Sequence, residues 1–144
     1  MDGNGGGLIC SSYDFVGEND WGCFGDAPLG ANGTAIGTGQ QNTNVILAGC
    51  TETGIAAYLC DTLNHNGYSD WFLPSRDELY QIYLSIGPGG IDANDNIAGF
   101  NLNWWYWSSS EYNGIKAWNV NFLNGDISNG NKDNPFKVRV IRSF

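Results

Sequence analysis

Basic residues are scarce in this chain. Lysine and arginine together number 6, against 15 aspartates and glutamates, and the formal net charge is −9 at pH 7. Such a chain repels a phosphate backbone at long range, so the composition argues against a nucleic-acid partner. The same repulsion argues against an anionic lipid surface or a sulfated polysaccharide. High solubility is the simplest consequence of this charge.

Long apolar runs are also missing. No stretch of about 18 apolar residues occurs, so we expect neither a membrane-spanning segment nor membrane insertion. The opening residues, "MDGNGGGLIC", contain no basic region followed by an apolar one, and no signal peptide is expected within them.

Histidine and cysteine are few and poorly spaced for a metal. The one histidine is His65, and no C-x-x-C pair occurs, so a zinc site is not expected. The cysteines are Cys10, Cys23, Cys50 and Cys60. They allow three complete disulfide pairings, which the sequence leaves open. In one continuous helix Cys50 and Cys60 would lie roughly 15 Å apart, too far for a disulfide, but a break at Gly49 or Gly54 would change that. An even count fits an oxidising compartment, and buried free thiols fit it equally well.

Aromatic residues and glycine are abundant. Aromatics make up 14% of the 144 residues, with 6 tryptophans, so we expect one globular domain over 1–144 with a large aromatic core. The 21 glycines indicate many turns, and residues 17–42 are predicted to form a glycine-rich ordered loop.

Two stretches are predicted to be helical. Residues 43–63 carry apolar side chains at three-to-five spacing and are expected to form a helix in one or two pieces. A second helix is expected to begin after Pro74, because Ser75 and Glu78 form a capping box, and to end at "GPGG". We assign Asp77 and Glu78 to helix capping rather than to catalysis.

The remaining regular segments are predicted to be strands. They cover residues 7–15, 104–112, 117–122 and 137–144. In "AWNVNF" the alternation is clear: Trp118, Val120 and Phe122 share one face, so Asn119 and Asn121 are predicted to point outward. The order of strand, loop, two helices and antiparallel sheet predicts an α+β fold.

Catalytic motifs are weak. His65 has no obvious catalytic partner, and the hydroxyls of "SSSE" at 108–111 have no adjacent histidine or lysine to activate them. Glu111, Asp126 and Asp133 could in principle pair as an acid and a base, but nothing in the sequence places two of them opposite each other. We therefore expect no enzyme.

No cofactor is expected either. The segment "DANDN" at 92–96 is rich in oxygen ligands, and calcium is the one alternative considered, but the regular ligand spacing and closing glutamate of a helix-loop-helix site are absent. Arg139 and Arg142 lie on a predicted strand, where structural ion pairs with acids are expected rather than ligand contacts.

Asparagine is concentrated near the C-terminus. Between Asn113 and Asn134, 7 of 22 residues are asparagine, although asparagine is a poor helix and strand former. A solvated turn region is the ordinary interpretation of such a stretch. The alternative is a binding surface, because small polar side chains form hydrogen bonds in many geometries and aromatic residues anchor a partner.

Several segments together resemble a known family. They are "GTAIGTGQQNTNVILAGC", "AAYLCDTLNHNGYSDWFLPSRDELYQIY", "YWSSSEYNGIKAWNVNF" and the terminal "VRVIRSF". Over about residues 7–144 the chain is similar to the C-terminal domain of a collagen-like bacterial adhesin, the Lcl C-terminal family, which is similar in turn to the C-type lectin fold. The resemblance implies two helices packed on a small antiparallel sheet with long ordered loops, and paired N-terminal and C-terminal strands. The calcium-dependent sugar-binding signatures of true C-type lectins are absent, since Trp118 is followed by Asn119 and Val120.

A narrower resemblance concerns the last forty residues. They look like the variable region, at about 101–136, of a protein diversified by a retroelement, in which template adenines are misread and asparagine codons become mixed codons. The resemblance implies that packed positions stay constant and that exposed polar positions bind the ligand. The implied constant positions are Trp105, Trp107, Trp118, Phe122 and Val138. The implied ligand-binding positions are Asn101, Asn103, Tyr112, Asn113, Gly114, Ile115, Asn119, Asn121, Asp126, Ser128, Asn129, Asn131, Asp133 and Asn134.

Three functions follow from these resemblances. The first is a receptor or adhesion domain that presents a hypervariable surface to a protein or glycan on a cell or host, placed outside the cell, on its surface or on a virion. The second is an invariant adhesin with a fixed partner. The third is an enzyme similar to the formylglycine-generating group, which would require reactive cysteines in a cleft. The oligomeric state is left open.

Overall fold

The computed structural model describes residues 6–90 and 96–144 and has an α+β architecture. The strands are β1 (Leu8–Cys10), β2 (Trp105–Glu111), β3 (Lys116–Asn121), β4 (Ile127–Asn131) and β5 (Ile141–Ser143). The helices are α1 (Gly39–Gly49), α2 (Ala56–Asp61) and α3 (Arg76–Ser85). None of the helices in the described part of the chain is long and apolar enough to cross a membrane.

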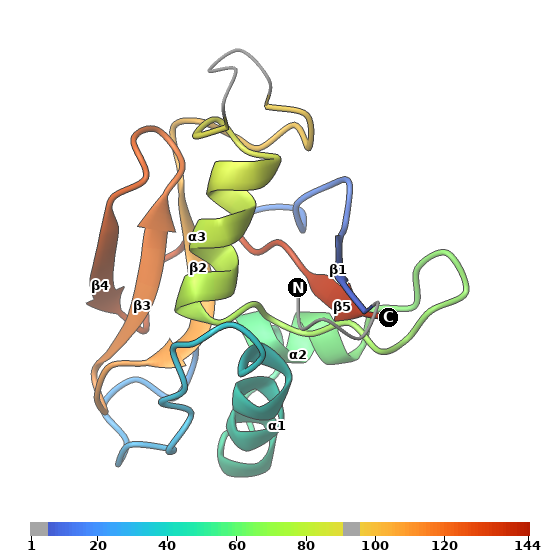
Figure 1. Cartoon of the computed structure of the whole chain (residues 1–144). Coiled ribbons are helices and arrows are strands. Elements are labelled where there is room, and N and C mark those ends of the chain that lie inside the picture. The colour runs from blue at the N-terminus through green and yellow to red at the C-terminus, as the bar shows by residue number, and fades with distance from the viewer. Residues whose placement is uncertain (1–5, 91–95) are drawn as a thin grey trace.

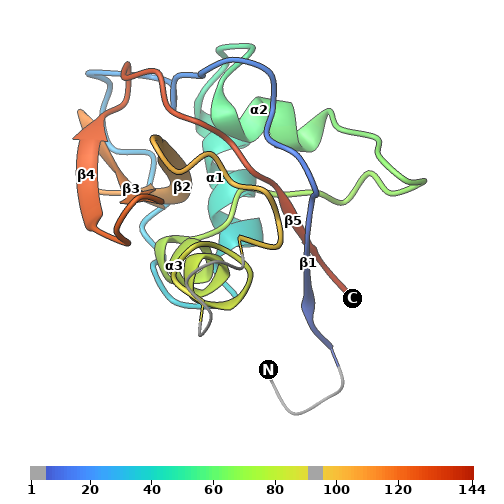
Figure 2. The ribbon, with the colours of Figure 1, turned by 90° about the horizontal axis from the view of Figure 1, so that it is seen from above.

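The two ends of the chain lie side by side. β1 pairs antiparallel with β5, with Ile9 opposite Arg142, and both figures show this ribbon on the opposite side of the molecule from β4 (Figures 1 and 2). Backbone hydrogen bonds extend the contact beyond the ribbon, from Phe15 N to Val138 O and from Asn19 N to Phe136 O. The terminal strands predicted at 7–15 and 137–144 are therefore shorter than expected, but the implied pairing of the termini is present.

The first predicted helix is two helices. α1 ends at Gly49, Cys50 is extended, and Gly54 takes a positive φ of 76° before α2 begins at Ala56. The helical prediction is confirmed, and of its two alternatives, one helix or two pieces, the structure shows two pieces. Helix α1 begins four residues before residue 43.

The start of α3 is as predicted. The Ser75 side chain accepts a hydrogen bond from Glu78 N, and the Glu78 carboxylate accepts one from Ser75 N. The same carboxylate also accepts from Gly37 N at 2.8 Å, so the cap fixes the glycine-rich loop as well as the helix. The capping assignment of Glu78 is confirmed.

A three-stranded antiparallel sheet of order β2-β3-β4 carries the asparagine-rich region. Helix α3 covers one face of β2 through Leu79, Tyr106 and Phe122, and leaves β4 uncovered at one side of the molecule (Figure 1). The opposite face packs on a second apolar cluster, which includes Trp21 and Trp107. Both faces of the sheet's centre are therefore buried.

This double coverage contradicts one prediction. Asn119 was expected to point outward, but it is 1% exposed, opposite Trp107 on β2 and Ser128 on β4. Its face is covered by the segment after β4, whose Phe136 ring lies 4.6 Å from that of Trp107. Alternation alone could not reveal this, because it separates two faces without saying which is solvated.

Strand β4 was not predicted. Residues 126–134 lie within the implied variable region, where no strand was expected, but Ile127–Asn131 pair with β3 over five positions. The strand is polar and lies at the edge of the sheet, so its sequence shows little of the apolar alternation by which strands are recognised.

Candidate functional site

The uncovered part of the sheet forms a surface beside the start of α3. Cross-strand partners are Lys116 with Asn131, Trp118 with Asn129, and Val120 with Ile127, and alternate residues along a strand share a face. We call the solvent-accessible part of this surface the β3–β4 face. Its members are Arg76, Tyr112, Lys116, Trp118, Ile127, Asn129 and Asn131.

An aromatic and cationic cluster lies at the centre of the β3–β4 face. The Tyr112 ring meets the Trp118 ring edge-on, with centroids 5.1 Å apart, and the Arg76 guanidinium carbon lies 5.1 Å from the Trp118 centroid. Tyr112 is 52% exposed and Ile127 is 41% exposed. Such a combination of aromatic rings, a guanidinium group and neighbouring amides is typical of binding surfaces.

Rigid elements hold this cluster. Arg76 N donates to the Ser110 hydroxyl at 2.9 Å, which ties the first residue of α3 to β2. Arg76 Nε donates to Asp77 Oδ1 at 2.8 Å. The terminal guanidinium nitrogens make no hydrogen bond within residues 6–90 and 96–144, so they are available to a partner.

Basic side chains elsewhere are bound to acids. Lys132, Lys137, Arg139 and Arg142 form ion pairs with Glu111, Glu18, Asp14 and Asp70, respectively. The predicted structural role of Arg139 and Arg142 is therefore confirmed. Lys116, in contrast, makes no ion pair with any described residue. In a chain of net charge −9, Lys116 is the one basic side chain without an ion pair among the described residues, and it lies on the β3–β4 face with Arg76, which is paired through Nε alone.

The predicted site residues do not share one surface. Tyr112, Asn129 and Asn131 lie on the β3–β4 face. Ser128 and the buried Asn119 lie on the opposite face of the sheet.

The hairpin between β2 and β3 uses two predicted residues structurally. Asn113 Oδ1 accepts from Ile115 N and from Lys116 N, both at 2.8 Å, and so closes the turn. A Cβ at Gly114 would overlap the carbonyl oxygen of Asp26. Ile115 itself is exposed at the tip of the hairpin.

The other predicted residues lie in turns. Asn121 and Asp126 flank the turn between β3 and β4, where Asn121 Oδ1 accepts from Leu123 N and Asp126 Oδ2 from Asn124 Nδ2. Asn101 and Asn103 precede β2 at this same end, and Asn101 Oδ1 accepts from Asn103 N at 3.2 Å. Asp133 and Asn134 form the turn after β4, near the opposite end of the sheet.

Four members of the β3–β4 face were not predicted as site residues. Arg76 was not considered, Lys116 was not selected, and Trp118 was treated as a packing residue. Arg76 and Trp118 are far apart in sequence and belong to different elements, so no local pattern connects them. Ile127 was not selected because it is a single apolar residue within a polar stretch.

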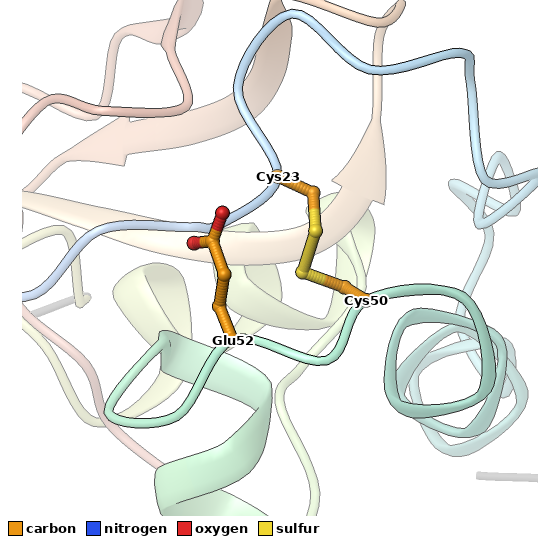
Figure 3. Close-up of side chains that lie close together, drawn as sticks. All are labelled: Cys23, Cys50 and Glu52. Carbon is orange, nitrogen blue, oxygen red and sulfur yellow. A yellow bond between two sulfur atoms is a disulfide. The ribbon is translucent and has the colours of Figure 1, made fainter.

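The cysteine pairing left open by the sequence is settled by the structure. Cys23 and Cys50 form a disulfide between the glycine-rich loop and the end of α1, with the Glu52 carboxylate beside it (Figure 3). Both sulfur atoms belong to that bond, so they are not free metal ligands. Burial raises the pKa of the Cys60 thiol far above its usual value, and burial raises the pKa of Cys10 to about 11 despite the nearby Arg139.

The hydroxyls of "SSSE" have structural partners. Ser108 Oγ donates to Trp118 O at 2.7 Å, Ser110 Oγ donates to Gly33 O at 2.7 Å, and Ser109 Oγ accepts from Asn42 Nδ2 at 3.3 Å. These bonds tie β2 to β3, to the glycine-rich loop and to α1. The segment therefore organises the scaffold behind the β3–β4 face.

Two other candidate features lie elsewhere. A cavity of about 170 Å³ lies between α3 and the β1–β5 ribbon, with Ile82, Ile86 and Ile141 in its lining, away from the asparagine-rich region. The segment considered for calcium, 92–96, falls outside the described residues except for Asn96, whose side chain bonds to Phe100 backbone atoms.

Comparison with known proteins identifies the family. The family model of the Lcl C-terminal domain matches residues 35–142, well over half of the chain. The chain belongs to the Lcl C-terminal domain family. The matched segment includes α3, β2, β3 and β4, and hence every member of the β3–β4 face.

A solved structure resembles this Lcl C-terminal domain in fold. It is a fimbrial protein from Bacteroides ovatus ATCC 8483, with 15% sequence identity and a TM-score of 0.59. The alignment covers 94% of this chain and 35% of the fimbrial protein, so the domain spans about a third of that protein's length. At this identity the likeness concerns the fold alone. Comparison with curated proteins finds no match.

Proposed function

We propose that this domain is a ligand-binding domain of the adhesion type, which binds a partner on a cell or host surface through the β3–β4 face. The observation that carries the proposal is the cluster of Arg76, Tyr112 and Trp118, which is held on rigid elements beside the uncovered strand β4. Tyr112 is exposed and the other two side chains are half-buried. Family membership and the fimbrial relative in fold support an adhesion role. The Cys23–Cys50 disulfide supports an extracellular, cell-surface or virion location.

The fold assignment is part of this proposal. We assign the domain to the C-type lectin-like class because its N-terminal and C-terminal strands pair, and because two main helices and a small antiparallel sheet are joined by long ordered loops. A structural comparison restricted to C-type lectin-like domains would test it: equivalent strands in a different order would contradict the assignment.

Diversification by a retroelement is the finer form of the proposal. Tyr112 and Asn131 are exposed and Asn129 is half-buried, and none of their side chains closes a turn, whereas Asn113 and Gly114 hold the hairpin. We propose that substitutions in sibling genomes concentrate at the first group, with an adenine bias. Sequencing the locus tests this, since differences spread evenly along the gene would favour the alternative, an invariant adhesin.

A catalytic role is not proposed. Enzymes similar to the formylglycine-generating group require reactive cysteines, but Cys50 is in a disulfide and Cys60 is buried with a raised pKa. The serine hydroxyls and Glu111 are engaged in structural bonds. These observations favour binding over chemistry.

The binding test uses the purified domain, labelled and applied to a glycan array and to an array of host surface proteins. For any array member bound, we expect Tyr112→Ala and Arg76→Gln to weaken binding at least tenfold, because both residues lie on the β3–β4 face. The matched control is Tyr58→Ala, which removes a partly exposed tyrosine from α2. Binding that depends on Tyr58 and not on Tyr112 would contradict the proposal.

A further inference from the structure

The outer edge of β4 is open for pairing with another strand. β4 is an edge strand in the order β2-β3-β4, and it lies at the extremity of the molecule in both views (Figures 1 and 2). Antiparallel strands alternate between residues that bond inward and residues that point their backbone groups away from the partner. The free groups of β4 can therefore be identified from the register.

The flanking bonds fix this alternation. Asn121 N donates to Asp126 O and Lys132 N donates to Ile115 O, both at 2.9 Å, so positions 128 and 130 bond inward to β3. The backbone N–H and C=O groups of Ile127 and Asn129 consequently point outward. They present two donors and two acceptors along one line, the pattern that an added strand requires.

This edge lacks the usual protection against pairing. Natural edge strands are blocked by charged side chains, proline, bulges or covering segments. The sequence of β4, "ISNGN", contains no charged residue and no proline, and its pairing with β3 is regular over all five positions. The outward backbone groups of Ile127 and Asn129 are therefore accessible to an added strand.

The side chains beside the edge suggest what the added strand carries. Trp118 and Ile127 offer apolar surface. Arg76, whose terminal nitrogens form no hydrogen bond with a described residue, and Lys116, which forms no ion pair with one, offer positive charge. A carboxylate on the added segment would meet these cations with opposite charge. We expect one such carboxylate rather than several, because the chain's net charge of −9 repels a highly acidic partner.

We infer that the ligand of the β3–β4 face is an extended peptide segment of a partner protein, which adds to the edge of β4 as a fourth strand and places an acidic side chain near Arg76 and Lys116. This inference rests on the proposed function and names the class of its ligand. Backbone pairing supplies affinity that tolerates sequence change, and the face side chains supply specificity. Such a division suits the variable surface proposed above.

The test measures binding of a synthetic peptide by nuclear magnetic resonance and calorimetry. The peptide is short, alternates valine and threonine around one central glutamate, and ends in lysine on both sides to keep it soluble. We expect perturbation of the amide signals of Ile127 and Asn129, and at least tenfold weaker binding when the glutamate is replaced by glutamine or when Arg76→Gln is introduced. A peptide methylated on alternate backbone nitrogens should lose binding at least tenfold, because it cannot complete the ladder. The experiment with the methylated peptide uses the unsubstituted protein, so misfolding of a variant cannot cause the loss.

Two variants of one residue separate edge pairing from side-chain recognition. Asn129→Pro removes an outward N–H group, a position where an edge strand tolerates proline, and is expected to lose at least tenfold in affinity. Asn129→Ala removes the same side chain but keeps the N–H group, so it is expected to bind at least fivefold more tightly than Asn129→Pro. Equal losses in the two variants, or full binding of the methylated peptide, would overturn the inference.

Other occupants give different results. An oligomer of galacturonic acid that binds where the peptide does not would indicate an acidic glycan, and a concentration-dependent dimer abolished by Asn129→Pro would indicate a second copy of this chain. Either result overturns the peptide inference. If binding on the arrays depends on Tyr112 but the peptide does not bind, the proposed function stands and the peptide inference is overturned. If substitutions on the β3–β4 face leave binding on the arrays unchanged, the proposed function itself is contradicted.

Discussion

Lys132 Nζ lies 2.7 Å from Glu111 Oε2, and the two side chains are 0% and 3% exposed, respectively. The Glu111 carboxylate also accepts from Leu29 N and Gly30 N, both at 3.0 Å. The ammonium group lies 4.5 Å from the centre of the Trp21 ring. One buried ion pair thus connects the glycine-rich loop to the end of β2 and to the turn after β4. Lys132 therefore has a structural role within the asparagine-rich region.

Glu111→Gln should destabilise the domain strongly. The substitution leaves the buried Lys132 ammonium without its counterion, and breaking a buried pair in this way costs about 3–5 kcal/mol. Urea unfolding followed by tryptophan fluorescence measures the change. The control is Arg142→Gln at the solvent-exposed pair with Asp70, which should cost much less. Equal losses for the two substitutions would contradict the structural role of the buried pair.

Reduction of the Cys23–Cys50 disulfide should also destabilise the domain. The bond joins residues 27 apart in sequence, and loss of a loop constraint of this length is worth about 3.5 kcal/mol. The double variant Cys23→Ser/Cys50→Ser, unfolded in urea, measures this without a reductant. The variant Cys60→Ala is the control for removal of a cysteine that forms no disulfide. In the native domain, Cys60 should resist thiol reagents, because burial raises the pKa of its thiol and excludes the reagent. Unchanged stability in the double variant would contradict this prediction.

Two aspartates should change stability in opposite directions with pH. Burial, followed by the charges of Asp133 and Glu52, raises the pKa of Asp20, so the folded state binds that proton more tightly and the unfolding free energy falls as pH rises through the folded pKa. Asp20→Asn should therefore stabilise the domain at neutral pH, by at most about 1 kcal/mol, and should have little effect in acid.

Asp70 is the matched control of opposite sign. The hydrogen bond from Arg142 lowers the pKa of Asp70, so its stabilisation is present above the usual carboxyl pKa and is lost as pH falls through the folded value. Asp70→Asn should weaken the domain at neutral pH and not in acid. Urea midpoints measured across the acid range test both substitutions, and the same sign for both would contradict the assignment of causes.

The sequence predicted what depends on local chemistry. The capping box of Ser75 and Glu78 is complete within four residues. The break between α1 and α2 lies between Gly49 and Gly54, the two positions at which the sequence allowed one. Pairing of β1 with β5 was implied by the family resemblance rather than by composition. Each of these features could be predicted because a few neighbouring residues, or the resemblance to the family, indicate it.

The sequence did not predict what depends on distant segments. Asn119 is buried because the segment that contains Phe136 packs on its face of the sheet. The alternation of residues along β3 does not indicate this packing. The contact of Arg76 with Trp118 joins a helix start to a strand in the middle of the sheet. For the same reason, asparagines close in sequence were divided between both faces and both ends of the sheet.

Substitutions at predicted variable positions should therefore separate into two classes. Gly114→Ala places a Cβ against the Asp26 carbonyl oxygen, and we expect a cost of about 1–3 kcal/mol, because backbone must move to relieve the overlap. Asn131→Ala removes an exposed side chain and leaves its carbonyl bonded to Asn134 N, so we expect a change within about 0.5 kcal/mol. Urea unfolding of both variants tests this, with Asn113→Ala as an intermediate case that loses the two bonds closing the hairpin. If Gly114→Ala proves as harmless as Asn131→Ala, the hairpin is free to vary, and the proposed variable surface extends to the end of the sheet beyond the β3–β4 face.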